Sequence, residues 1–73
     1  MENKKVTDII AQCASVRAAD IHPELSLVYD LYMDSMMFTE MICFLEEEFS
    51  VTLTEQDVIE WYSVRDIYNH FKQ

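Results

Sequence analysis

The chain contains no glycine in 73 residues, and this absence restricts its possible folds more than any other feature. Glycine takes a positive φ at little cost, and the tight turns of β-hairpins usually need such a residue. Pro23 is the only proline that could mark a turn instead. A chain of this composition is poorly suited to antiparallel strands, so we expect an all-α fold built as a helical bundle.

The net charge narrows the range of partners. The chain has 14 acidic and 5 basic residues, which gives a formal net charge of -9. Nucleic-acid binding needs cationic side chains that displace counterions, and anionic membranes repel an acidic protein, so we expect neither partner. Basic docking surfaces fit such a chain, and repulsion between copies favours a monomer. Hydrophobic residues make up 51%, which is too many for a disordered acidic chain.

The length predicts a single domain over residues 1–73, near the lower limit for a core without staples. Cys13 and Cys43 form no ligand motif, so we expect neither a disulfide scaffold nor a metal site. The first residues, MENKKVTDII, lack the apolar stretch of a signal peptide, and no apolar run is long enough to span a bilayer. We therefore expect a cytoplasmic protein.

The spacing of apolar residues predicts four helices of unequal length. The segment between the first and second lacks a helical period and is long for an irregular connection. We expect its apolar residues, among them Leu27, Val28 and Leu31, to pack as the segment crosses the bundle. The expected helices run over residues 4–16, from Asp34 or Ser35 to 49, over 55–61, the short third helix, and over 64–73.

The second helix has two contrasting faces. Its core stripe consists of Phe38, Met41, Ile42, Leu45 and Phe49, which recur at helical spacing. The opposite face carries methionines among carboxylates, and flexible thioethers suit a surface that repacks against several partners. We predict that this face docks partner proteins through Met36, Met37, Glu40, Phe44 and Glu47.

Ser35 stands between Asp34 and a run of bulky apolar residues, where it could cap the helix, act as a nucleophile or carry an attached group. A serine nucleophile needs a nearby base and an oxyanion hole. The only histidines are His22, in the long connection, and His70, far along the last helix. No glycine is present to shape a nucleophile elbow. We therefore do not expect an enzyme, whereas capping and attachment both remain open.

The segment DLYMDSM, the helix ending FLEEEF and the following VTLT resemble the acyl carrier protein family, from about Leu25 to Phe71. The family pattern is D-S-[LM] at the start of the second helix. The resemblance implies a four-helix bundle of acyl-carrier type with a long first loop. It also implies that Ser35 carries 4′-phosphopantetheine, which a phosphopantetheinyl transferase takes from coenzyme A, supplying the base and Mg²⁺ itself. Asp34 would then cap the helix and help to present the serine and metal to that enzyme.

Such an arm ends in a thiol that holds an acyl group as a thioester. The resemblance therefore implies partners that load, extend and remove acyl groups, namely ligases, synthases and transferases, in fatty-acid-like or secondary-metabolite biosynthesis. The helical core could also shelter an apolar chain. The candidates for lining such an acyl pocket are Ile42, Leu45, Leu53, Val58 and Trp61.

The match departs from the family in the approach to the serine, where Tyr32 and Met33 stand at places usually held by glycine. Met37 replaces a common acid, whereas the matching acids Glu40, Glu46 and Glu47 are retained. The D-S-M triplet together with Trp61 is similar to D-alanyl carrier proteins, so an amino-acid cargo is one alternative. An acidic helical adaptor without a prosthetic group is an alternative of another class.

Overall fold

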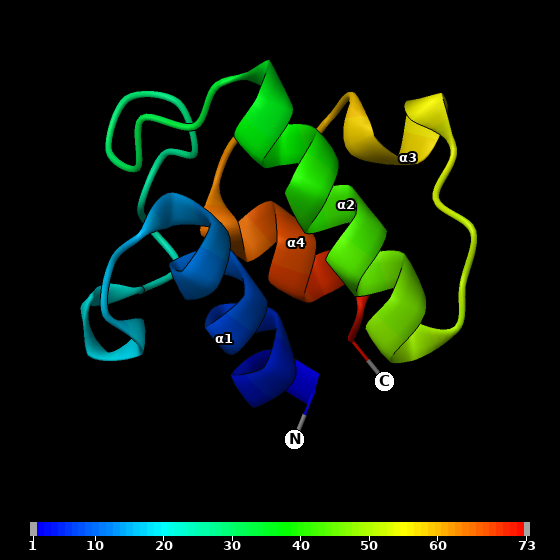
Figure 1. Cartoon of the computed structure of the whole chain (residues 1–73), viewed down its shortest axis with the longest axis horizontal. Coiled ribbons are helices and arrows are strands. Elements are labelled where there is room, and N and C mark those ends of the chain that lie inside the picture. The colour runs from blue at the N-terminus through cyan, green and yellow to red at the C-terminus, as the bar shows by residue number, and fades with distance from the viewer. Residues whose placement is uncertain (1, 73) are drawn as a thin grey trace.

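The computed structural model describes residues 2–72 and shows four α-helices around one apolar core (Figure 1). The all-α, four-helix prediction is confirmed. A short 3₁₀ helix, η1, lies in the long connection between the first two helices. The helices are α1 (Glu2–Ala14), α2 (Ser35–Phe49), α3 (Glu55–Val58) and α4 (Val64–His70), and η1 is Ala18–Asp20.

The two long helices end in the same way, although the chain has no glycine. Ser15 and Ser50 take positive φ values of 59° and 53° directly after α1 and α2. The next N–H groups bond back to carbonyls five residues earlier, Val16 to Ala11 at 3.0 Å and Val51 to Glu46 at 3.2 Å. This is the Schellman arrangement, with serine where glycine is usual. Because Ser15 turns the chain, α1 ends at Ala14, and the predicted end at residue 16 was wrong.

The third helix is shorter than predicted. A capping box starts it: Asp57 N–H donates to Thr54 Oγ1 at 3.2 Å, and Thr54 N–H donates to the Asp57 carboxylate at 2.9 Å. The helix then ends at Val58 rather than at residue 61, because the chain turns there and brings Trp61 into the core. The fourth helix ends at His70, not at the predicted Gln73, which lies outside the described residues.

The long connection is tied to the rest of the fold by main-chain bonds. Leu27 N–H donates to the Tyr62 carbonyl at 2.9 Å, and Val64 N–H donates to the Leu25 carbonyl at 3.0 Å. Leu27 and Leu31 are buried, as predicted. Val28 is 59% exposed, so its predicted packing was wrong. It lies within the turn that closes where Asp30 and Leu31 donate to the Ser26 carbonyl.

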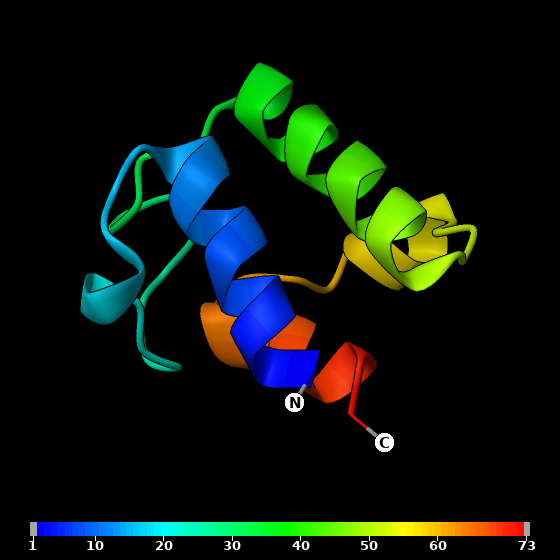
Figure 2. The ribbon, with the colours of Figure 1, turned by 60° about the horizontal axis from the view of Figure 1, so that its bottom comes forward.

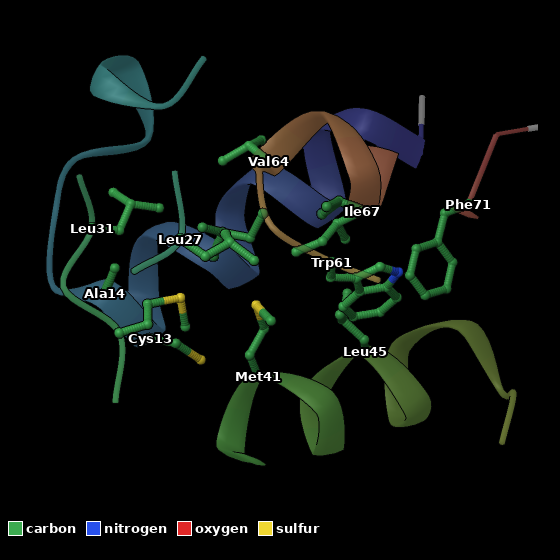
Figure 3. Close-up of a cluster of buried hydrophobic side chains, with 13 residues drawn as sticks. Cys13, Ala14, Leu27, Leu31, Met41, Leu45, Trp61, Val64, Ile67 and Phe71 are labelled. Carbon is green, nitrogen blue, oxygen red and sulfur yellow. The ribbon is translucent and has the colours of Figure 1, made fainter. Parts of the chain in front are cut away.

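The core is built around the inner face of α2. Met41 and Leu45 are both fully buried and point toward side chains of the long connection and α4, as Figure 3 shows. Aromatic rings close the far end of this core, where Phe49 stacks on Phe71 with centroids 4.5 Å apart. In Figure 1 α1 and α3 lie on opposite sides of α2, and in the turned view of Figure 2 α1 lies to the left of α2 while α3 overlaps its C-terminal end. The inner stripe of α2 therefore sets how this helix is rotated, and with it the direction of its outer face.

A carboxylate holds the start of α4. The Asp66 carboxylate accepts from Tyr62 N–H at 2.8 Å and from Ser63 N–H at 2.9 Å. The bond from Tyr62 N–H has the larger effect and the bond from Ser63 N–H the next, and together they hold the pKa of Asp66 below its usual range. A carboxyl group whose pKa is lowered by folding stabilises the fold above its unfolded pKa, and this stabilisation is lost as the pH falls through its folded pKa.

Asp66→Asn should therefore destabilise the protein by about 1 kcal/mol at pH 7, after allowance for solvent screening of a group near the surface. The cost should shrink as the pH falls below about 4, because Asp66 then binds a proton in the unfolded parent and, at lower pH, in the folded parent as well. Urea denaturation of both proteins at the two pH values measures this. Glu60→Gln, in the neighbouring turn, controls for the change in net charge. An Asp66→Asn cost that stays constant down to pH 3 would contradict the assignment.

Candidate functional site

The start of α2 presents Ser35 without using it as a cap. Asp34 is the N-cap residue, and its Oδ1 accepts from Met37 N–H at 2.8 Å. Ser35 is the first residue of the helix and is exposed. The structure therefore assigns the capping role to Asp34, which leaves the Ser35 hydroxyl available for another purpose.

The local electrostatics at Ser35 favour an anionic group. The first N–H groups of a helix have no intrahelical acceptor, and the helix dipole places partial positive charge there. A phosphate attached at this position is consequently stabilised by the end of a 15-residue helix. One turn later, Thr39 Oγ1 donates to the Ser35 carbonyl at 2.8 Å, which adds a second bond to this first turn.

The two residues before Asp34 anchor the approach to the serine. Met33 is buried in the core, and its N–H donates to the Leu27 carbonyl at 3.0 Å. Tyr32 has a φ of 57°, in the left-handed region that favours glycine, and its side chain is 78% exposed. A glycine would take this conformation without a Cβ clash, and a non-glycine residue there is strained by about 1 kcal/mol.

The two histidines have other surroundings. His22 Nδ1 lies 3.3 Å from Glu24 Oε1 in the long connection. The His70 ring packs edge-on against Trp61 and Phe71, with centroids 5.4 Å and 5.0 Å away. Within residues 2–72 neither histidine forms a hydrogen bond with Ser35. Neither histidine is therefore placed to act as a base for Ser35.

The predicted docking residues lie mostly on the outer face of α2. Met36 is 74% exposed, Phe44 is partly exposed, and Glu40 and Glu47 are exposed. Met37 differs, because it is half-buried and packs against the core. Residues 35–49 contain no lysine or arginine. The outer face of α2 therefore combines apolar side chains with carboxylates and carries no cation of its own.

The three consecutive glutamates at the end of α2 have different surroundings. Glu46 accepts from Leu53 N–H at 2.8 Å and so holds the chain that follows the helix. Glu48 pairs with Lys5 of α1 at 3.2 Å. Glu47 points outward and is exposed. Of the two acids at this end that match the family, Glu46 therefore has a structural contact, and Glu47 belongs to the outer face.

The predicted pocket residues are packed, and each cavity that the structure shows is lined by at most one of them. Leu45 and Trp61 are buried, and Ile42, Leu53 and Val58 are half-buried. Phe38 of α2 also contacts Trp61, which follows α3, edge-to-face with ring centroids 6.4 Å apart. A pocket among these residues stays a prediction, and it would need rearrangement of this packing.

Two features are absent from residues 2–72. No group of three or more histidine, cysteine or acidic side chains is arranged to hold a metal ion. Among the same residues, no helix has the length and apolar character needed to cross a bilayer.

Comparison with known proteins gives consistent matches. Residues 4–71 match the family model described as a phosphopantetheine attachment site. An acyl carrier protein of Clostridium acetobutylicum is 38% identical over 69 residues, which cover 94% of this chain and 90% of that protein. One of Solidesulfovibrio magneticus is 38% identical over 63 residues, covering 86% and 81%. A solved structure described as a candidate acyl carrier protein, from Mycobacterium tuberculosis, superposes with a TM-score of 0.86 at 26% identity, covering 94% of this chain and 92% of that one.

The strain at Tyr32 can be measured. Tyr32→Gly should raise the free energy of unfolding by about 0.5–1 kcal/mol, because glycine takes the positive φ without the Cβ clash but loses more chain entropy on folding. Tyr29→Gly is the matched control, since Tyr29 is also exposed but its φ is not positive. It should leave stability unchanged or lower it. Equal effects of the two substitutions in urea denaturation would contradict the backbone argument.

Proposed function

The chain belongs to the acyl carrier protein family, defined by its phosphopantetheine attachment site, and from this premise we propose that the arm is attached to Ser35. Acyl carrier proteins are carriers rather than enzymes, and their cofactor is 4′-phosphopantetheine. The arm supplies a thiol that holds an acyl group as a thioester. The chain's own residues place the attachment point and present it to partner enzymes.

The observation that carries this proposal is the exposed hydroxyl of Ser35 at a helix start that Asp34 already caps. The other serines fit less well. Ser15 and Ser50 follow the C-terminal ends of α1 and α2, where the dipole disfavours an anion. Ser26 Oγ accepts from Tyr29 N–H, and Ser63 takes part in the capping box of α4.

In the transfer reaction this chain supplies the nucleophilic oxygen but not the base or the metal. The Ser35 oxygen attacks the pyrophosphate of coenzyme A, the phosphodiester forms, and the 3′,5′-adenosine bisphosphate leaves. The transferase supplies the base and Mg²⁺. One carboxylate oxygen of Asp34 is bonded to Met37 N–H, so the other can face the transferase and its metal. Ser35 contributes its exposure, and α2 contributes a favourable field for the phosphate.

Partner enzymes are proposed to dock on the outer face of α2 through basic surfaces. Lys4, Arg17 and Arg65 are each paired with a carboxylate outside α2, and Lys5 is paired with Glu48 near the end of α2. Glu40 and Glu47 thus meet a partner's cations without competition from cations on α2, while Met36 and Phe44 provide apolar contact. Such binding is expected to be brief and to weaken with salt. The cytoplasmic setting stays a prediction.

For the cargo, we propose acyl intermediates of fatty-acid-like or secondary-metabolite biosynthesis. One observation favours the amino-acid alternative: the contact between Phe38 and Trp61 occupies the side of α2 where an apolar chain could enter the core. A long chain would have to displace these rings, whereas a small cargo such as an aminoacyl group would not.

Attachment can be tested with coenzyme A that bears a fluorophore on its thiol, Mg²⁺ and a broad-specificity phosphopantetheinyl transferase. The parent should become fluorescent in a denaturing gel, and Ser35→Ala should lose more than about 99% of the label, because no other hydroxyl accepts the group. Ser50→Ala, at the other end of the same helix, should label like the parent. A folded parent that takes no label from two different transferases would favour the adaptor.

Docking can be tested by charge reversal. Glu47→Lys should lower kcat/KM of the transferase for this protein about 3–10-fold at low salt, because it turns an attraction into a repulsion. Glu55→Lys on α3 makes the same charge change away from the outer face and should have less than half that effect on a logarithmic scale. The Glu47→Lys difference should fade as salt is added. Equal losses for both variants would show that only net charge matters.

A further inference from the structure

A shallow groove runs along the outer face of α2 and begins at Ser35. Its volume is about 420 Å³, and its walls are mostly apolar. Two rows of side chains spaced four residues apart form the walls, as expected for the surface of a helix. The rows comprise Ser35, Thr39 and Cys43 on one side, and Met36, Glu40 and Phe44 on the other.

The groove starts at the proposed attachment point and has a chemistry that suits a pantetheine arm. Eight residues separate Ser35 from Cys43, which corresponds to about 12 Å along the helix. The arm bears a dimethyl group, two amides and a terminal thiol. The Met36 and Phe44 side chains offer apolar contact to its methyl and methylene groups. The Glu40 carboxylate can accept from an amide N–H, and the Thr39 hydroxyl, which donates to the Ser35 carbonyl, retains a lone pair for another.

The alternative resting place, inside the bundle, is filled. Leu45 is fully buried, and Phe38 on the same side of α2 contacts Trp61, which follows α3. Trp61 also lies 6.3 Å from Phe71, centroid to centroid, so the rings extend from Phe38 across to α4. Entry of the arm on this side would have to separate packed rings, whereas the outer groove is open without any such change.

We propose that the phosphopantetheine arm rests in this outer groove of α2 and not between α2 and α3. This inference rests on the proposed attachment at Ser35. It has a consequence for docking, because Met36, Glu40 and Phe44 belong both to the groove and to the docking face. A partner that binds this face displaces the arm, so docking releases the thiol toward the partner's active site. The two events then compete for one surface and are linked.

Cys43 provides a direct probe of the arm's position. It is an exposed free thiol that lines the groove, whereas Cys13 is buried, and burial followed by the Glu40 charge raises the pKa of the Cys13 thiol. When the arm-bearing protein is treated with oxidised glutathione, the arm thiolate attacks it and releases one glutathione. The Cys43 thiolate then attacks the mixed disulfide and releases the second. The product has an internal disulfide and has lost two hydrogen atoms.

The matched control moves the thiol by one position. Cys43→Ser combined with Ile42→Cys places a thiol at nearly the same height on α2 but on the side that faces the interior. We expect the internal disulfide to form at least about 10-fold faster with Cys43, because the groove raises the effective concentration of the arm thiol there. Equal or faster closure in the Ile42→Cys variant would overturn the proposal. The rate of disulfide formation is measured only for molecules whose intact mass includes the arm. A failure to attach the arm is therefore distinguished from a failure to form the disulfide.

Backbone amide shifts supply a second measurement that does not depend on thiol reactivity. Spectra of the protein before and after attachment should differ most at Met36, Thr39, Cys43 and Phe44, well beyond the residues next to Ser35. Shifts concentrated instead at Ile42, Leu53 and Val58 would place the arm inside and overturn the proposal. Shifts confined to Ser35 and its neighbours would show an arm free in solvent and would overturn it as well.

Discussion

The burial of Met41 and Leu45 in the middle of α2 is the interaction on which the rest of the structure depends. Both side chains are fully inaccessible and join the long connection, Trp61 and α4 in one core (Figure 3). Because they point inward, the rotation of α2 is set, and side chains on the other side of the helix must face solvent. The same packing holds the start of the helix in one place. A carrier needs a rigidly placed attachment point and a recognisable surface beside it, and under the proposed function α2 would provide both.

Within residues 2–72, three residues other than glycine adopt a backbone conformation that glycine would take more easily. Ser15, Tyr32 and Ser50 all take a positive φ. The two serines each end a helix with the bonds of a Schellman motif, which offsets part of the strain. Tyr32 has a different setting, because it lies directly before the buried Met33 and three residues before Ser35. The chain therefore reaches the proposed attachment site through a strained residue with a large exposed ring, held on both sides by packing and capping. Strain of this kind persists only where the surrounding structure enforces it.

Much of the fold and of the site could be predicted from the sequence, because both depend on local patterns. The inner stripe of α2, its start and its end follow from helical periodicity and from the polar residues at its boundaries. Periodicity could not locate the end of α3, because the apolar residues after Val58 serve a turn that brings Trp61 into the core and not a further helical turn. Nor could it show that Val28 is exposed while Met33 is buried, since main-chain bonds between distant segments decide this. The choice between Asp34 and Ser35 as the cap also needed geometry. The resemblance placed a glycine at position 32 or 33, and this was the one signal of the positive φ found at Tyr32.

The central claim is that Ser35 carries the phosphopantetheine arm. The most direct test is fragmentation mass spectrometry of the intact protein isolated from bacteria that also produce a phosphopantetheinyl transferase. The account predicts fragment ions that place one phosphopantetheine group on Ser35 in essentially every modified molecule. A group located on Ser26, Ser50 or Ser63 would contradict the claim, and so would a well-folded protein that carries no such group.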